Sequence, residues 1–161
     1  MLRLAQTDRK WGNTLIGNSK ISKISSHGCL ITALCCIWSK FYHTPKDKNM
    51  LRPDEIATRW TFVAVKDDPD PKYLLWSSVD DGMKFIWRNF GYAPTKLMED
   101  PVTHLVATER EILKDYMNSE NYGVVFQVKT KSGGQHWCAG VSYGVLGVVA
   151  NECTEDDETQ V

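Results

Sequence analysis

Apolar residues recur at helical spacing directly after Gly28. The positions in this pattern are Leu30, Ala33, Leu34, Ile37, Trp38 and Phe41. Intervals of three and four residues place all of them on one face of an α-helix, so the pattern predicts a helix over residues 29–42. Comparable spacing, with proline or glycine at some of the expected helix ends, predicts further helices over residues 53–60, 79–90 and 109–118.

The last third of the chain has a different pattern, which is typical of strands. An apolar run, Val124–Val128, predicts the first strand. A second strand is expected to begin near His136, to turn back at Gly144–Gly147, and to be followed by a third that ends at Asn151. Helices in the first two thirds and strands in the last third favour an α+β fold with an antiparallel sheet.

Two segments predict irregular structure. Residues 1–28 contain the turn signals Gly12-Asn13 and Gly17-Asn18, and Trp11 is expected to pack this arm onto the body. Residues 66–72 combine three acids with two prolines, which indicates a solvated surface loop. A cation site among these acids is the less favoured alternative.

Length and composition indicate a single soluble domain. The 161 residues are 42% hydrophobic and 24% charged, which is ordinary for a globular protein, so one domain is expected over residues 1–161. The net charge of −1 provides no basic field, so neither nucleic acid nor an anionic membrane surface is expected as a partner. The acidic tail, about residues 154–161, is expected to be solvated or disordered.

The start of the chain and its hydrophobic runs bear on localisation. Residues 1–10 carry charges and have no apolar core, so no cleaved secretory signal is expected. No uncharged apolar run approaches the length of a bilayer span. The expected location is therefore the cytoplasm, or outside the cell after lysis or packaging in a virion.

The five cysteines predict neither a disulfide framework nor a metal site. They are Cys29, Cys35, Cys36, Cys138 and Cys153. The number is odd and the spacing matches no zinc motif, so reduced thiols, no metal and no cofactor are expected. Cys35 and Cys36 are predicted to be small core residues. A metal site built from His27, Cys29, His136 and Cys138 is disfavoured because a zinc signature is lacking.

Cys29 stands where a cysteine nucleophile would be activated. The first turn of a helix has unpaired N–H groups and the positive end of the helix dipole, and both favour a thiolate. Gly28 allows a sharp turn that leaves the sulfur uncovered. Taken alone, Cys29 is more often a small buried residue that begins a core helix.

A second stretch of sequence, residues 133–151, favours the catalytic interpretation of Cys29 over the structural one. His136 begins an expected strand, and the following hairpin can return Asn151 beside it. A thiol, an imidazole base and an amide oxygen that orients the imidazole are the parts of a cysteine-nucleophile triad. Trp137 should point to the opposite face of the sheet from His136, so we expect it to pack the sheet without a catalytic role.

Several short motifs together resemble the C39-like peptidases of the papain-like class, in particular their stand-alone branch. The motifs are Gln6-Thr7-Asp8-Arg9-Lys10-Trp11, Gly17, Gly28-Cys29, Arg52-Pro53-Asp54-Glu55-Ile56, Val124–Val128, and His136 followed by an apolar strand with Gly140. The resemblance implies a papain-like fold with a central nucleophile helix packed on a C-terminal antiparallel sheet. It implies Cys29 as nucleophile, His136 as base, Asn151 as orienting residue and Gln6 as oxyanion-hole donor. Many relatives carry Asp at the position of Asn151, whereas papain itself keeps Asn.

The resulting hypothesis is a thiol-dependent hydrolase that cleaves an amide bond. Its substrate would be a peptide, a protein, or the stem peptide of bacterial cell wall. The alternative is a catalytically silent papain-like module that binds a peptide or protein partner.

Overall fold

The structure is a computed structural model that describes residues 1, 3–41, 51–79, 107–129, 134–144 and 147–151. Its helices are α1 (Ile24–His27), α2 (Cys29–Phe41), α3 (Pro53–Arg59) and α4 (Ala107–Asn118), with one 3₁₀ turn, η1 (Trp76–Ser78). Its strands are β1 (Phe62–Val65), β2 (Asp68–Leu74), β3 (Val125–Lys129), β4 (Gln135–Gly144) and β5 (Gly147–Asn151). The described part is an α+β fold with two small antiparallel sheets, β1-β2 and β3-β4-β5.

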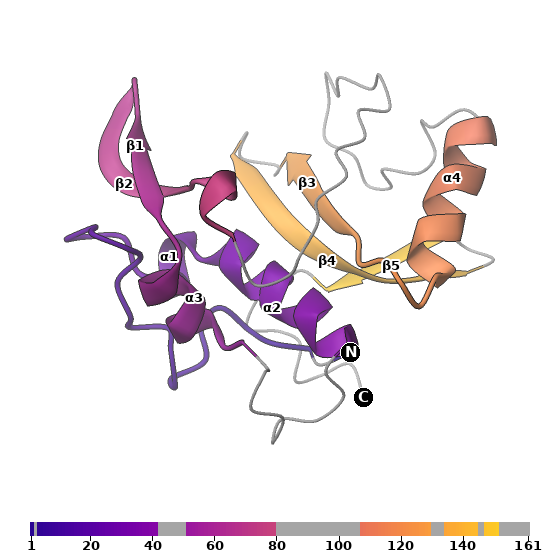
Figure 1. Cartoon of the computed structure of the whole chain (residues 1–161), viewed down its shortest axis with the longest axis horizontal. Helices are drawn as coiled ribbons and strands as arrows, with labels where there is room; N and C mark the ends of the chain where they lie inside the picture. The colour runs from indigo at the N-terminus through magenta and orange to yellow at the C-terminus, as the bar shows by residue number, and fades with distance from the viewer. Residues whose placement is uncertain (2, 42–50, 80–106, 130–133, 145–146, 152–161) are drawn as a thin grey trace.

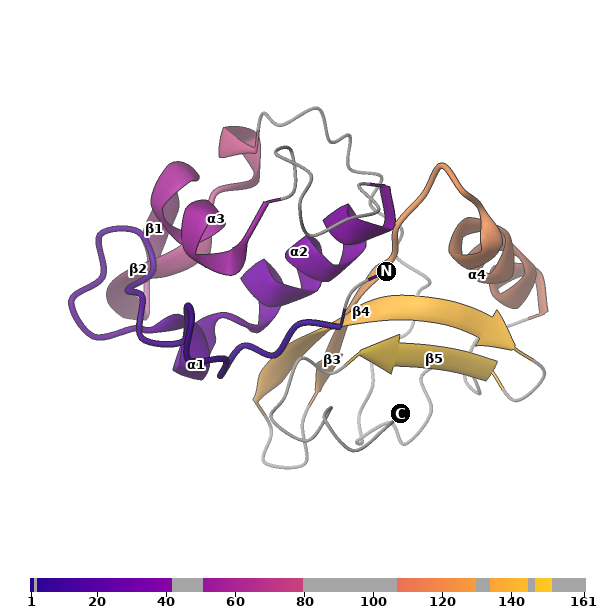
Figure 2. The same ribbon diagram turned by 90° about the horizontal axis from the view of Figure 1, so that it is seen from below.

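Helix α2 lies between the N-terminal half and the three-stranded sheet (Figures 1 and 2). It contacts α1 and α3 on one side and packs on β4 on the other. Residues 31–39 are therefore buried on every side of the helix, whereas the sequence predicted one apolar face. The predicted face was real but incomplete, because small residues such as Thr32, Cys35 and Ser39 fill the tight contacts on the remaining sides.

The other predicted helices have mixed outcomes. Helix α3 confirms the helix expected over residues 53–60, with Pro53 in its first turn and a capping box between Arg52 and Glu55. Helix α4 confirms the helix expected over residues 109–118 and begins two residues earlier, at Ala107. The helix predicted over residues 79–90 lies, beyond Val79, outside the described residues, as does the acidic tail.

The loop expected over residues 66–72 was wrong, whereas the irregular arm expected over residues 1–28 is confirmed apart from one short helix. Residues 66–72 belong to the β1-β2 hairpin, although their prolines and acids resemble a loop. The prolines are tolerated because β2 pairs on one side only and its register with β1 is irregular. Within residues 1–28, Ile24–His27 form the short helix α1, and Leu15 bridges to Lys23. Trp11 is buried in the core, as expected.

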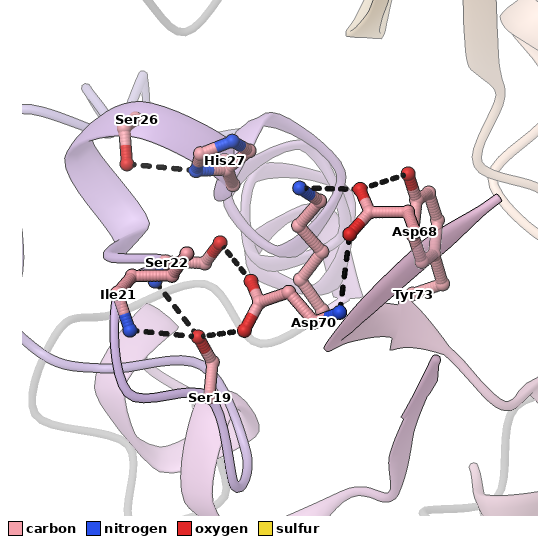
Figure 3. A network of polar contacts seen from close by, with 9 residues as sticks. Ser19, Ile21, Ser22, Ser26, His27, Asp68, Asp70 and Tyr73 are labelled. Atoms are coloured by element: carbon pink, nitrogen blue, oxygen red, sulfur yellow. Dashed lines mark hydrogen bonds and ion pairs between the residues drawn. The ribbon is translucent and has the colours of Figure 1, made fainter. Parts of the chain in front are cut away.

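A polar network explains why residues 66–72 are ordered (Figure 3). The half-buried Asp70 carboxylate accepts hydrogen bonds from the buried Ser19 hydroxyl, at 2.6 Å, and from the Ser22 hydroxyl. Asp68 pairs with Lys72 Nζ at 2.7 Å and accepts a hydrogen bond from the Tyr73 hydroxyl at 2.9 Å. The β1-β2 hairpin is thus fastened to the loop that leads into α1 and then to Cys29.

This network predicts a loss of stability in acid. Hydrogen bonds from Ser19 and Ser22 lower the pKa of Asp70, and the hydrogen bond with Lys72 is the main cause that lowers the pKa of Asp68 to about 2. A carboxyl whose pKa is lower in the folded state stabilises the fold above its unfolded pKa of about 3.9. That stability is lost as the pH falls toward the folded pKa. The thermal midpoint should therefore drop between about pH 4 and about pH 2.

Asp70→Asn should lower the thermal midpoint at pH 6 and flatten this acid dependence, as followed by circular dichroism. Asp115→Asn is the matched control, because Asp115 is exposed on α4. A variant Asp70→Asn that melts like the wild type at pH 6 would contradict the stabilising role of the network.

The two faces of the C-terminal sheet are covered by different helices. Ala33, Cys36 and Ile37 of α2 pack with Ala139 on one face, together with Val125 and Trp137. Leu113 and Met117 of α4 pack on the other face, against a second set of residues: Val124, Phe126 and Tyr143. The expectation that Trp137 packs the sheet is confirmed. The expected turn at Gly144–Gly147 is also confirmed, because these two glycines pair at the end of the β4-β5 hairpin.

Candidate active site

The start of α2 is shaped by Gly28. The Gly28 N–H donates to the Ile24 carbonyl at 2.7 Å, and the Gly28 carbonyl accepts from the Thr32 N–H at 2.8 Å and the Thr32 hydroxyl at 2.9 Å. A Cβ at Gly28 would lie 2.6 Å from the Ile24 carbonyl oxygen and 2.7 Å from its Cα. Glycine is therefore required by space, and it lets α1 end directly against Cys29, the first residue of α2.

The structure brings the Cys29 thiol and the His136 ring together. Burial is the largest influence on the Cys29 pKa and raises it, but several groups act in the opposite direction. A hydrogen bond with the His136 ring, hydrogen bonds from the backbone N–H groups of Trp137 and Leu30, and the positive charge of His136 together leave the pKa below that of an ordinary cysteine. The half-buried thiol thus has a helix start on one side and the beginning of β4 on the other.

Comparison with known proteins adds no relative. The chain matches no protein family, no curated protein and no solved structure.

Gln6 lies against the segment that precedes Cys29. Its Nε2 donates to the Ser25 carbonyl in α1 at 2.8 Å, and its Oε1 is buried with no hydrogen-bond partner among the described residues. The neighbouring backbone is fixed on both sides. Trp11 Nε1 donates to the Ala5 carbonyl at 2.8 Å, and the Leu4 N–H donates to Cys36 Sγ at 3.4 Å. A side-chain amide has two N–H bonds, so one remains for another acceptor.

Asn151 does not pair with His136 across the hairpin. Its backbone pairs with Ala139, three residues farther along β4, which corresponds to about 10 Å of strand. A bulge at Val141 shifts the register, and without it Asn151 would stand opposite Gly140, one residue more distant. The side chain of Asn151 lies outside the described part of the structure.

The remaining candidate groups point elsewhere. The His27 ring nitrogen Nδ1 contacts the Ser26 hydroxyl at 2.8 Å, and Cys35 is buried, which raises its thiol pKa well above the ordinary value. None of the described cysteines, Cys29, Cys35, Cys36 and Cys138, forms a disulfide bond. Within the described residues, no three of the histidines, cysteines and acids are grouped to hold a metal ion. None of the described helices has the length and hydrophobicity needed to traverse a lipid bilayer.

Sequence reasoning anticipated one backbone donor to the thiol, at the helix start, and missed the other, the Trp137 N–H. The N–H groups of Leu30 and Trp137 act on Cys29 through the main chain, and any residue type other than proline provides such a group. The N–H of Leu30 is one of the unpaired N–H groups expected at the helix start, because the first N–H groups of a helix lack intrahelical partners. The N–H of Trp137 depends on how β4 docks on α2, and no local pattern indicates it.

Proposed function

We propose that this chain is a thiol-dependent hydrolase of papain-like fold that cleaves an amide bond, with Cys29 as nucleophile and His136 as general base. The observation that carries the proposal is the hydrogen bond between the Cys29 thiol and the His136 ring, made by residues far apart in the sequence. Nucleophile and base within hydrogen-bond reach is the arrangement that activates a cysteine for acyl transfer.

The proposed reaction has two halves. The Cys29 thiolate attacks the carbonyl carbon of the amide, and the protonated His136 ring gives its proton to the departing amine as the C–N bond breaks. Water then attacks the thioester carbonyl, His136 takes the proton of that water, and the C–S bond breaks to release the acid and restore the thiol. Gln6 is the proposed side-chain donor to the oxyanion, and Asn151 the proposed orienting group for the imidazole.

Charge and sequence resemblance narrow the substrate class. The proposed substrate is a peptide, a protein or the stem peptide of peptidoglycan, because the C39-like peptidases that the sequence resembles act on amide bonds. A nearly neutral chain offers no field to attract nucleic acid.

One observation favours the second candidate function, a silent module that binds a peptide or protein. The register that separates Asn151 from His136 by three residues leaves the orienting role without a direct cross-strand contact. The two candidates differ in turnover. A binding module would keep the Cys29–His136 contact and yet cleave nothing.

Selective chemistry at Cys29 provides the test. The wild-type chain is treated at pH 6 with iodoacetamide, and separately with an epoxide inhibitor of thiol proteases, and each cysteine is then quantified by peptide mapping. Cys29 should be modified first, and the buried Cys35 is the internal control. In parallel, a peptide library and purified muropeptides are incubated with wild type and Cys29→Ala. Cleavage by the wild type alone supports the hydrolase, whereas labelling without cleavage of any substrate supports the binding module.

A further inference from the structure

The indole of Trp137 connects the two halves of the molecule beside the candidate active site. On one side it packs against the cluster formed by Ala33, Cys36 and Ile37 of α2 with Ala139 of β4. On the other side the ring of Trp76 in η1 meets it edge-on, with ring centroids 6.3 Å apart and an interplanar angle of 62°. Aromatic pairs favour this edge-to-face arrangement at centroid distances of about 4.5–7 Å.

Trp76 is itself held in the N-terminal half. Its half-buried side chain packs against the main core cluster, which includes Trp11, Leu34 and Trp60. The turn that carries it is fixed by hydrogen bonds on both sides. The Leu75 N–H donates to the Thr61 carbonyl at 2.9 Å, and the Thr61 N–H donates to the Ser78 hydroxyl at 3.0 Å. The Trp76 ring is therefore held in position by the N-terminal half where it contacts the Trp137 indole.

The same residue, Trp137, donates its backbone N–H to the Cys29 sulfur and follows His136 directly. A movement of β4 that withdrew this N–H would also have to move the indole away from Trp76 and α2. We propose that Trp76 is a positioning residue, whose ring holds Trp137 so that the start of β4 keeps its backbone donor and His136 on the Cys29 sulfur. This inference rests on the proposed function, because it assigns Trp76 a role at the same thiol.

The expected consequence is a change in the reactivity of Cys29 with pH. Of the described titratable side chains, His136 is the one whose charge acts on Cys29, and the other contributions come from the backbone of Trp137 and Leu30. Loosening β4 weakens the contributions of Trp137 and His136 together, while the Leu30 N–H and the burial of the thiol remain. The thiol should then ionise at higher pH.

The experiment compares Trp76→Met, which keeps apolar volume without a ring, with Trp76→Phe, which restores a ring. The rate of Cys29 alkylation by iodoacetamide is measured from pH 5 to pH 10 in the full chain. Trp76→Met should raise the midpoint by about half to one pH unit, a fall of about three- to tenfold in reactivity at pH values below the wild-type midpoint. Trp76→Phe should stay close to the wild type.

The matched control is Tyr122→Leu, which breaks another edge-to-face pair, Tyr116–Tyr122, at 4.8 Å and 80°. Its midpoint should not move, whatever its effect on the melting temperature. If Trp76→Met melts lower but keeps the wild-type midpoint, Trp76 is only structural and the inference fails alone. If Trp76→Phe shifts as much as Trp76→Met, the ring contact is not the cause and the inference is overturned. A wild-type midpoint near that of free cysteine overturns both this inference and the proposed function.

Discussion

Replacing His136 with alanine should abolish turnover and move the pH profile of Cys29 alkylation upward. In the wild type, the His136 ring hydrogen-bonds with the Cys29 thiol and its positive charge favours the thiolate. The wild-type thiol should therefore react below the free-cysteine pKa of about 8.5. Without the ring, burial of the thiol remains as an opposing influence, so the reactive limb should approach or exceed that value.

His27→Ala is the matched control for this change. His27 stands two residues before Cys29, but its ring is exposed and contacts the Ser26 hydroxyl. The His27→Ala profile should overlay the wild type. If His136→Ala also overlays it, Cys29 and His136 are not a functional pair and the binding module becomes the better account.

Comparison of single and double variants separates the chemistry from its orientation. Cys29→Ala and His136→Ala should each remove turnover, and the double variant should be little worse than either, because the two groups act as a unit. Asn151→Ala should weaken turnover less, and Asn151→Asp should retain a good part of it, because many of the C39-like peptidases that the sequence resembles carry an acid at this position. An Asn151→Ala variant with unchanged turnover would show that the register offset in the β4-β5 hairpin excludes Asn151 from the site.

The sequence predicted the elements whose cause is local. Apolar spacing after Gly28 predicts helix α2, and apolar runs on either side of a glycine turn predict the β4-β5 hairpin. The β1-β2 hairpin could not be predicted in this way, because its residues Asp68–Pro71 have a loop composition. They are held in a strand by Asp70, whose partners Ser19 and Ser22 lie far away in the sequence.

In the candidate site, too, the features with a local cause were predicted and those that depend on tertiary contacts were not. Residue type and order were enough to single out Cys29 and His136, and the structure brings these two together. The bulge at Val141, which decides where Asn151 falls, depends on pairing between strands and has no residue signature in this chain. The Trp137 N–H and the contact of its indole with Trp76 likewise arise only when β4 docks on α2 and the N-terminal half.

Replacing Gln6 with alanine should lower turnover by about a hundredfold or more and leave the alkylation profile of Cys29 unchanged. An oxyanion donor acts on the tetrahedral intermediate and not on the thiolate, and loss of one such donor costs about 2.7–4 kcal/mol of transition-state stabilisation. The segment that carries Gln6 is fixed by Trp11 and Cys36, and its Nε2 is held on Ser25, so the second N–H of the amide has a defined direction.

The matched control is Gln127→Ala, which removes an exposed glutamine of β3 whose Nε2 donates to Gln135 Oε1 at 3.0 Å. Its turnover should equal that of the wild type on the same cleaved peptide. Loss of both turnover and alkylation in Gln6→Ala would mean that Gln6 holds α1 and the start of α2 in place through Ser25, a structural role. Unchanged turnover would assign the oxyanion to another donor, with Asn13 and Asn18 the next to replace. Alkylation depends on the thiolate, whereas turnover also depends on stabilisation of the oxyanion. The two measurements on Gln6→Ala therefore distinguish an oxyanion donor from a residue that only supports the structure.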